Sequence, residues 1–179
     1  MDIQIIGVGR LGSQVAFCSL MFLRPDVIAL HDIKNLEGDV MDLEHAKQGY
    51  KYLHGKPCNT EIKTGLIPAD VIVIAAGETR SSERTNEEWM EMNKKHLTKI
   101  IDNIKTKPDT KIIIATNLVL ELTEWAQNKY PQYNFFHAED EIMKYRNGVE
   151  LGIEILKTKG YTNFGPSMSI VEKIKQLSS

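Results

Sequence analysis

The feature of the sequence that most constrains the fold is a glycine-rich turn near its amino end. The apolar residues Ile3, Ile5 and Ile6 lead directly into Gly7-Val8-Gly9-Arg10-Leu11-Gly12, and an apolar, helix-forming stretch follows over residues 11–23. A strand, a tight turn and a helix N-terminus in this order are typical of the phosphate-binding element of doubly wound α/β folds.

Each glycine of this turn has its own task in such a fold. Gly7 permits the tight turn, Gly9 lets the backbone approach a phosphate, and Gly12 lets the helix pack closely on the strand. The free N–H groups and partial positive charge at the helix start, around Arg10 and Leu11, favour an anion. The alternative is a tight turn that binds nothing. We interpret the pattern as a site for a dinucleotide pyrophosphate.

A carboxylate at the end of the second predicted strand indicates which dinucleotide binds. Asp32 closes the apolar strand at residues 27–30 and follows Gly12 by about 20 residues. A carboxylate at this place can accept hydrogen bonds from the hydroxyls of the adenine-side ribose, and it repels a 2′-phosphate. The sequence therefore predicts NAD, rather than NADP, as the cofactor.

Predicted strands and helices alternate over the first three quarters of the chain, which is typical of an α/β fold. We expect a doubly wound, mostly parallel sheet of about six strands (a Rossmann fold) with added C-terminal helices. A dinucleotide-binding domain is predicted over residues 1–137, and a helical part packed on it over residues 138–179. The further strands are expected near residues 60–63, 71–77, 111–116 and 133–137. The further helices are expected at about 36–50, 85–105, 119–130, 138–157 (with a break near Gly148 left open) and 161–177.

Composition and charge argue against several other classes of protein. The formal net charge is −2 and no basic block stands out, so no nucleic-acid partner is expected. Cys18 and Cys58 are far apart and no metal-ligand spacing occurs, so neither a disulfide framework nor a metal site is expected. No apolar run approaches the ~20 residues of a membrane span, and no signal peptide is evident, so the prediction is a cytoplasmic protein without membrane contact.

Five later segments resemble the lactate/malate dehydrogenase family, and they occur in the family's order. They read EGDVMDLEHA at 37–46, AAGETR at 75–80, EMN at 91–93, TNLV at 116–119 and KGYT at 159–162. The resemblance implies an NAD-dependent 2-hydroxy-acid dehydrogenase ancestry of the malate type, with a small 2-oxo or 2-hydroxy acid as the substrate of such an enzyme.

The same resemblance assigns roles to matching residues. Ala76 and Gly77 would line the cofactor cleft, Asn117 would lie near the nicotinamide and the substrate carbonyl, and Arg80 matches an arginine that binds the substrate carboxylate in malate-type members. The full predicted cofactor site is Gly7, Gly9, Arg10, Leu11, Gly12, Asp32, Ile33, Ala76, Gly77 and Asn117.

The sequence departs from the family where the reaction takes place. Reduction of a keto acid needs a proton donor at the carbonyl oxygen and a cation on the carboxylate. In the family a histidine of a G-x-H-G segment is the donor, oriented by an aspartate of an L-D-x-x-R segment, and this sequence contains neither segment. Asn86 stands at the position of the family's mobile-loop arginine, and Leu118 stands at the proline of its T-N-P-V segment.

His137 is the remaining candidate for a proton donor. It ends the last predicted strand, and the acidic residues Glu139, Asp140 and Glu141 follow it, so an oriented acid–base pair is conceivable. In the alternative interpretation the acids only stabilise a helix N-terminus and His137 is an ordinary loop residue. The candidate catalytic residues are therefore Arg80, Asn117 and His137.

Three hypotheses follow. The preferred one is an NAD(H)-binding, dehydrogenase-like protein that lacks the usual catalytic histidine and aspartate. The second is a compact, active malate-like dehydrogenase, and the third is a nicotinamide-sensing or scaffolding protein. In the family the helices at 36–49, in the region 86–105 and near the C-terminus build a two-fold interface, so a homodimer is expected. The candidate contacts are Met41, Leu43, Met90, Met92, Leu97, Ile170 and Val171.

Overall fold

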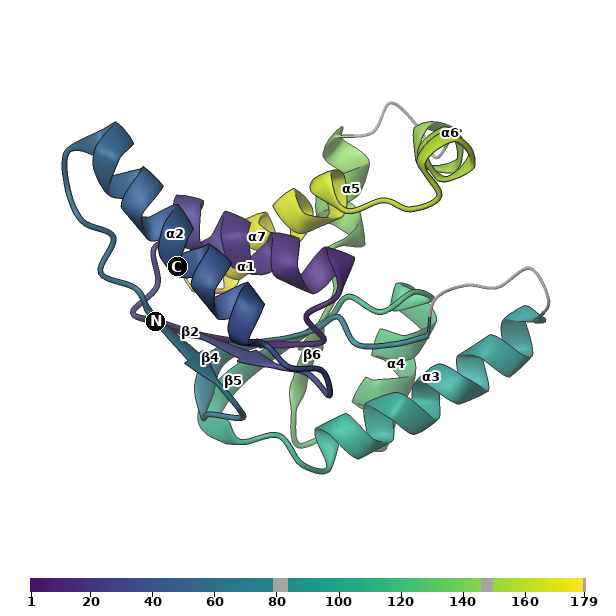
Figure 1. The fold of residues 1–179 in the computed structure, drawn as a ribbon. Coiled ribbons are helices and arrows are strands. Elements are labelled where there is room, and N and C mark those ends of the chain that lie inside the picture. Colours follow the sequence, from purple (N-terminus) through teal and green to yellow (C-terminus); the bar gives the residue numbers. More distant parts are fainter. Residues whose placement is uncertain (79–83, 146–149, 179) are drawn as a thin grey trace.

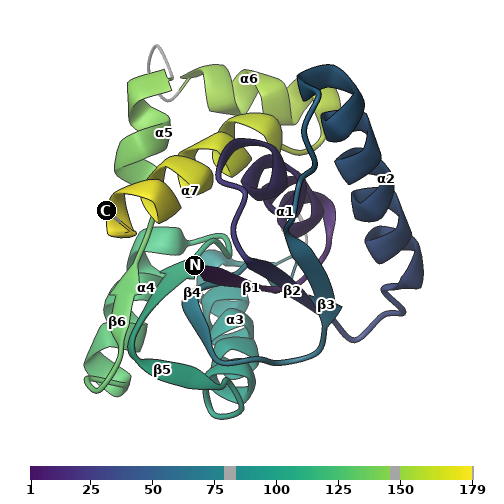
Figure 2. The ribbon, with the colours of Figure 1, turned by 90° about the vertical axis from the view of Figure 1, so that its left-hand side faces the viewer.

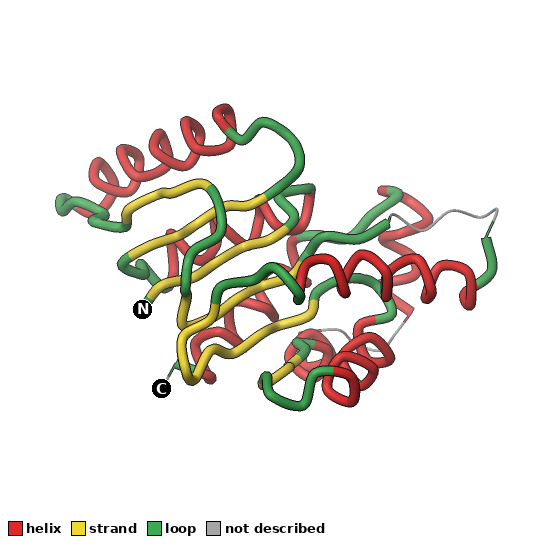
Figure 3. The backbone as a smooth tube through the Cα atoms, turned by 90° about the horizontal axis from the view of Figure 1, so that it is seen from below, coloured by secondary structure: helices red, strands yellow, loops and turns green. Residues whose placement is uncertain are grey.

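The computed structural model describes residues 1–78, 84–145 and 150–178, and it contains a six-stranded parallel sheet with helices on both faces (Figure 1). The strands lie in the order β3-β2-β1-β4-β5-β6, and every neighbouring pair is parallel. Seen from below, they run side by side across the molecule (Figure 3). Their bounds are β1 Asp2–Ile6, β2 Val27–His31, β3 Glu61–Thr64, β4 Ala69–Ile74, β5 Thr106–Ile114 and β6 Asn134–Phe136.

The strand order reverses between β1 and β4. The chain moves outward from β1 to β3 and then returns to place β4 on the other side of β1. In open α/β sheets ligands bind at such a reversal, outside the carboxyl ends of the strands. The predicted doubly wound α/β fold of about six strands is confirmed, and its binding edge is defined by the ends of β1 and β4.

The helices divide between the two faces of the sheet (Figures 1 and 2). One face carries α1 (Arg10–Phe22), α2 (Glu37–His54), α5 (Glu139–Tyr145) and α7 (Phe164–Leu177), and the other carries α3 (Asn86–Ile101) and α4 (Val119–Lys129). The remaining helix, α6 (Glu150–Lys159), lies farther from the sheet.

Alternating side chains of the central strands supply the core on each face, as the pleat of a strand requires. Ile3 and Ile5 belong to the cluster that α1 and α7 cover, whereas Ile72 and Ile74 belong to the cluster beneath α3 and α4. All four side chains are fully buried. This explains why these strands are continuous runs of apolar, mostly β-branched residues.

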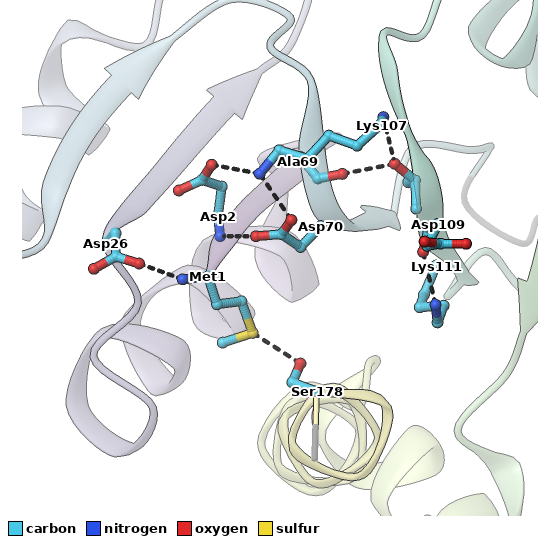
Figure 4. A network of polar contacts seen from close by, with 10 residues as sticks. Met1, Asp2, Asp26, Ala69, Asp70, Lys107, Asp109, Lys111 and Ser178 are labelled. Atoms are coloured by element: carbon cyan, nitrogen blue, oxygen red, sulfur yellow. Dashed lines mark hydrogen bonds and ion pairs between the residues drawn. The ribbon is translucent and has the colours of Figure 1, made fainter.

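An ion-pair network ties the amino ends of the central strands together (Figure 4). The Lys107 ammonium donates to Asp2 Oδ2 and to Asp70 Oδ1, each at 2.7 Å, and the Asp2 N–H donates to Asp70 Oδ2 at 2.7 Å. These two carboxylates raise the pKa of Lys107. Partial burial alone would raise the pKa of Asp70, but its hydrogen bonds with Lys107 and Asp2 hold that pKa below its ordinary value.

The C-terminal helix α7 packs along α1 and against α5. Two ion pairs join α5 to α7, Glu141 with Lys173 at 2.8 Å and Lys144 with Glu172 at 3.2 Å. Glu141 is almost fully buried; burial alone would raise its pKa, but the bond from Lys173 keeps the pKa lowered. The helical part thus rests on the sheet domain, while its division from the rest at residue 138 stays a prediction.

Several element boundaries differ from the predictions. Helix α3 ends at Ile101, and β5 begins at Thr106, ahead of the expected turn at Pro108-Asp109. The register between β4 and β5 shifts, with Ala69 opposite Thr106 but Val71 opposite Lys111. The residues between these partners bulge out of the ladder, which is where a sheet tolerates proline. The helical stretch expected from residue 138, for which the sequence leaves a break near Gly148 open, consists of two helices, α5 and α6.

Candidate functional site

The turn between β1 and α1 fits closely against its neighbours at two glycines. Gly7 has a φ of +90°, a value that residues other than glycine rarely adopt, and a Cβ there would lie 2.3 Å from the Ala76 nitrogen. A Cβ at Gly12 would lie 1.9 Å from the Gly7 carbonyl oxygen. Gly7 therefore lets the turn pack against the segment that follows β4, and Gly12 lets α1 pack against the turn.

The middle glycine is different because it faces open space. No heavy atom lies within 4 Å of the position that a Gly9 Cβ would occupy, and its φ of −82° suits any residue. Gly9 is the N-cap of α1, and no side chain caps this helix. The N–H groups of the first helical turn, which includes the exposed Arg10 and the half-buried Leu11, are thus accessible from this side, as an anion requires.

Asp32 is bound to this turn through its carboxylate. Its Oδ2 accepts a hydrogen bond from the Val8 N–H at 2.6 Å, and its Oδ1 accepts one from the Lys34 N–H at 3.2 Å. These bonds fix the acid at the carboxyl end of β2, beside the glycines. The next residue, Ile33, exposes its whole side chain.

A surface pocket of about 540 Å³ opens next to Asp32. It lies between the carboxyl ends of β2 and β3 and the start of α2, and apolar side chains of Leu36, Val40 and Met41 line it together with Thr64. Its combination of one fixed acid and an apolar wall is characteristic of small-molecule sites.

The ends of β4 and β5 meet at the same edge of the sheet. Thr116 Oγ1 donates to the Ala76 carbonyl oxygen at 2.7 Å, and a Cβ at Gly77 would lie 2.2 Å from the Thr116 methyl group. Asn117 follows and is exposed. The contacts Gly7–Ala76, Val8–Asp32 and Gly77–Thr116 therefore gather the predicted cofactor residues along one edge.

Helix α3 holds the residue after Gly77 in a way that the sequence did not predict. The Glu78 N–H donates to Asn93 Oδ1 and the Glu78 carbonyl accepts from Trp89 Nε1, each at 3.0 Å. The Glu78 carboxylate lies 3.6 Å from His96 Nε2 and 3.9 Å from Arg84. Asn93 belongs to one of the segments that resemble the dehydrogenase family, and that match was the signal that could have identified it.

The backbone after Asn117 is strained. Leu118, which stands where the family has proline, has a φ of +65° and precedes the first residue of α4. A branched apolar residue seldom adopts this left-handed conformation, which costs roughly 1–2 kcal/mol. Such strain is commonly found at functional sites.

The candidate catalytic residues are not assembled into an acid–base pair in the part of the chain that the structure describes. Arg80 lies outside the described residues. His137 follows β6, and its Nδ1 is buried without a hydrogen bond. Within residues 137–141 no hydrogen bond or ion pair joins His137 to an acid, and Glu141 is bound to Lys173.

The described residues contain neither a metal-binding cluster nor a membrane-spanning helix. No group of three or more histidine, cysteine, aspartate or glutamate side chains in residues 1–78, 84–145 and 150–178 is arranged to hold a metal ion. Over the same ranges no helix has the length and apolar character needed to cross a bilayer.

The reversal of strand order, the glycine turn and the fixed acid together define a dinucleotide-binding α/β domain. Residues 1–136 match the family described as lactate/malate dehydrogenase, NAD binding domain. The chain therefore belongs to the lactate/malate dehydrogenase family, as the sequence motifs predicted. The prediction of NAD as the cofactor is confirmed by the same match.

Individual relatives extend this assignment. Malate dehydrogenase from Archaeoglobus fulgidus is 30% identical over 153 residues, which are 79% of this chain and 50% of the relative. The L-lactate dehydrogenase A chain from Caiman crocodilus apaporiensis is 26% identical over 171 residues, covering 89% of this chain and 50% of the relative. The chain thus spans about half the length of these relatives.

Solved structures share the fold over nearly the whole chain. Malate dehydrogenase from Archaeoglobus fulgidus, in complex with NADH, aligns with a TM-score of 0.76 at 24% identity, covering 98% of this chain and 76% of that one. A minor L-lactate dehydrogenase from Enterococcus mundtii aligns with a TM-score of 0.76 at 15% identity, covering 96% and 75%. The C-terminal helices are therefore part of the shared fold.

Proposed function

We propose that this chain binds NAD(H) at the glycine turn and does not reduce the usual keto acids of its family at ordinary rates. One observation carries the binding half of the proposal: Gly9 is open while Gly7 and Gly12 are closely packed. A turn that served packing alone would have no reason to keep its middle glycine exposed above an uncapped helix.

The residues present fit an extended dinucleotide. N–H groups at the start of α1 would hold the pyrophosphate, and Asp32 would accept the ribose hydroxyls on the adenine side. The 540 Å³ pocket lies beside Asp32 on this side. Gly77 and Asn117 would border the nicotinamide half. When bound, NAD(H) supplies or accepts a hydride.

The catalytic half of the proposal rests on what the reduction demands. A proton donor must be held in place at the substrate oxygen, and the 179 residues contain no G-x-H-G or L-D-x-x-R segment. Among residues 1–78, 84–145 and 150–178 no carboxylate is bound to the His137 ring, and Glu141 is paired with Lys173. Weak or absent turnover follows.

Two measurements on one sample test the proposal. Binding is followed by energy transfer from tryptophan to NADH, because Trp89 donates to the carbonyl of Glu78, the residue after Gly77. Oxaloacetate, pyruvate and other 2-oxo acids are then added. We expect saturable NADH binding, weaker NADPH binding and no NADH oxidation. Turnover of ~10–1,000 s⁻¹ would contradict the catalytic half, and absence of NADH binding would contradict the proposal as a whole.

A compact, active dehydrogenase that uses Arg80, Asn117 and His137 is the second candidate. It is favoured by one observation, a histidine beyond the end of β6 whose Nδ1 is not committed to any hydrogen bond. It predicts that His137→Ala abolishes turnover of some 2-oxo acid while NADH affinity is retained. If no acid in the panel oxidises NADH, this candidate is rejected.

A cytoplasmic homodimer, which would also suit a scaffolding role, stays a prediction. Met41 on α2 is 66% exposed and available to a second copy. The other candidates include four that are buried in the core of the chain itself and so cannot supply the predicted contacts: Leu43, Leu97, Ile170 and Val171. Sedimentation with and without NADH distinguishes a dimer, a monomer and an NADH-dependent assembly.

A further inference from the structure

The loop between α6 and α7 reaches back to the glycine turn. The Arg10 guanidinium, in the first turn of α1, lies over the Tyr161 ring at 4.2 Å from its centroid. The Lys159 ammonium lies 4.5 Å from the centroid of the same ring. The two cations therefore lie within the sum of these two distances of each other. This separation is shorter than the ~10 Å Debye length of 0.1 M salt, so salt does not fully screen one charge from the other.

The local backbone explains why this loop comes to the turn. Gly160 ends α6 in the left-handed conformation, with a φ of +81°, and its N–H donates to the Leu156 carbonyl at 2.9 Å. This is the usual glycine stop of a helix. It redirects the chain immediately after Lys159, so Tyr161 leaves the axis of α6 and is half-buried.

The carboxylates that the structure describes do not balance the charge at this point. Among the residues that the structure describes, no carboxylate is paired with Arg10 or Lys159, and the first turn of α1 contains no acid. The Lys159 ammonium donates to the neutral amide oxygen of Asn163 at 2.8 Å and lies 4.1 Å from the centroid of the Phe164 ring. Two cations thus share one aromatic ring beside the N-terminus of a helix, where an anion is favoured further.

We propose that Lys159 and Tyr161 complete the phosphate site of the glycine turn. Lys159 binds a phosphate oxygen of the dinucleotide from the C-terminal side, and Tyr161 positions Arg10 and Lys159 through cation–π contacts. This deepens the proposed function and rests on it. It assigns a cofactor-binding role to helices that lie outside residues 1–136, the part matched to the NAD-binding domain.

The diphosphate is the favoured occupant because two cations and a helix start converge here. A monovalent carboxylate would need only one of the cations. In the proposed site the adenine-side ribose is bound by Asp32, which the Val8 N–H holds in place, and adenosine carries no phosphate for Lys159 to bind. The adenosine portion therefore provides an internal reference that Lys159 does not affect.

The test compares ligands with and without phosphate. NADH, ADP-ribose and adenosine are titrated by calorimetry into the wild-type chain, K159Q and the control K157Q, which removes an exposed lysine two residues away on α6. We expect K159Q to bind NADH and ADP-ribose about tenfold more weakly, the order of one charge-assisted hydrogen bond. We expect K157Q to match the wild type, and adenosine to bind all three alike.

A second pair of variants examines the ring. Tyr161→Phe keeps the aromatic face and should bind NADH as the wild type does, whereas Tyr161→Leu should weaken NADH binding several-fold. Thermal denaturation of each variant verifies folding.

The outcomes separate the two levels of inference. A wild-type chain that does not bind NADH refutes the proposed function and this inference with it. A wild-type chain that binds NADH, with K159Q and K157Q equal to it, refutes only the role of Lys159. Equal weakening of adenosine by K159Q also refutes it, because the effect would then not act through phosphate.

Discussion

Replacing Gly9 with alanine separates ligand binding from folding at the glycine turn. The added methyl group meets nothing within 4 Å, and the φ of −82° is ordinary for alanine. Alanine is a poorer N-cap than glycine, but it also restricts the unfolded chain, so we expect the free energy of unfolding to change by no more than about 1 kcal/mol.

NADH binding should respond strongly, because the methyl group occupies the side from which the pyrophosphate approaches. If the diphosphate loses two hydrogen bonds with backbone N–H groups, each worth about 1.5–3 kcal/mol to a charged partner, at least ~3 kcal/mol is lost. This corresponds to a rise of roughly a hundredfold or more in Kd. Tryptophan-to-NADH energy transfer measures the affinity, and thermal denaturation measures stability.

Gly7→Ala is the matched control in the same turn. Its Cβ would overlap the Ala76 nitrogen, 2.3 Å away, at a φ of +90°. Conformational strain of about 1–2 kcal/mol and overpacking of about 1–3 kcal/mol should then lower stability. If Gly9→Ala binds NADH with wild-type affinity, the turn does not hold the phosphates. If Gly9→Ala destabilises the chain as much as Gly7→Ala, the surroundings of Gly9 are packed and not open.

Three further predictions concern other contacts. Asp32→Ala should weaken NADH binding at least about tenfold, since it removes an acceptor for two ribose hydroxyls, and unchanged affinity in the titration would exclude Asp32 from the ribose site. Lys173→Met should lower the free energy of unfolding, measured by urea denaturation, by about 3 kcal/mol because it leaves buried Glu141 unpaired. The double variant Lys173→Met/Glu141→Leu should regain most of this loss, and a double variant as unstable as the single one would mean that packing, not charge, is responsible. The free energy of unfolding should fall as pH drops through the lowered pKa of Asp70, and it should also fall as pH rises through the raised pKa of Lys107. Lys107→Met should reduce each of these two pH-dependent losses by about 1 kcal/mol or less, since the groups are partly exposed. Thermal melts of this variant over a pH series that match the wild type would contradict the prediction.

Much of the fold could be predicted because its signals are local. The apolar strands at residues 3–6, 71–74 and 112–114 are long enough to be recognised without knowing their neighbours. The glycine turn and Asp32 are separated by a nearly fixed spacing in this fold class, so the sequence alone predicted that they lie together, and the bond from Val8 to Asp32 joins them.

The unpredicted features depend on partners that are distant along the chain. The early start of β5 accompanies a bulge whose Lys107 pairs with Asp2 and Asp70. Trp89 and Asn93 form hydrogen bonds with the backbone of Glu78. Because every residue type has these backbone groups, the amino acid at position 78 does not indicate the contact. The contact of Arg10 with Tyr161 joins residues that are far apart in the sequence. The spacing of apolar residues along the chain does not indicate such a contact.

The ion-pair network around Lys107 and the glycine turn lie at opposite rims of one sheet. Residues that hold the strands in register are thereby kept apart from residues that face a ligand. Loops at the carboxyl rim can consequently change in length and chemistry while the amino rim preserves the scaffold, so new specificities can arise here without rebuilding the protein.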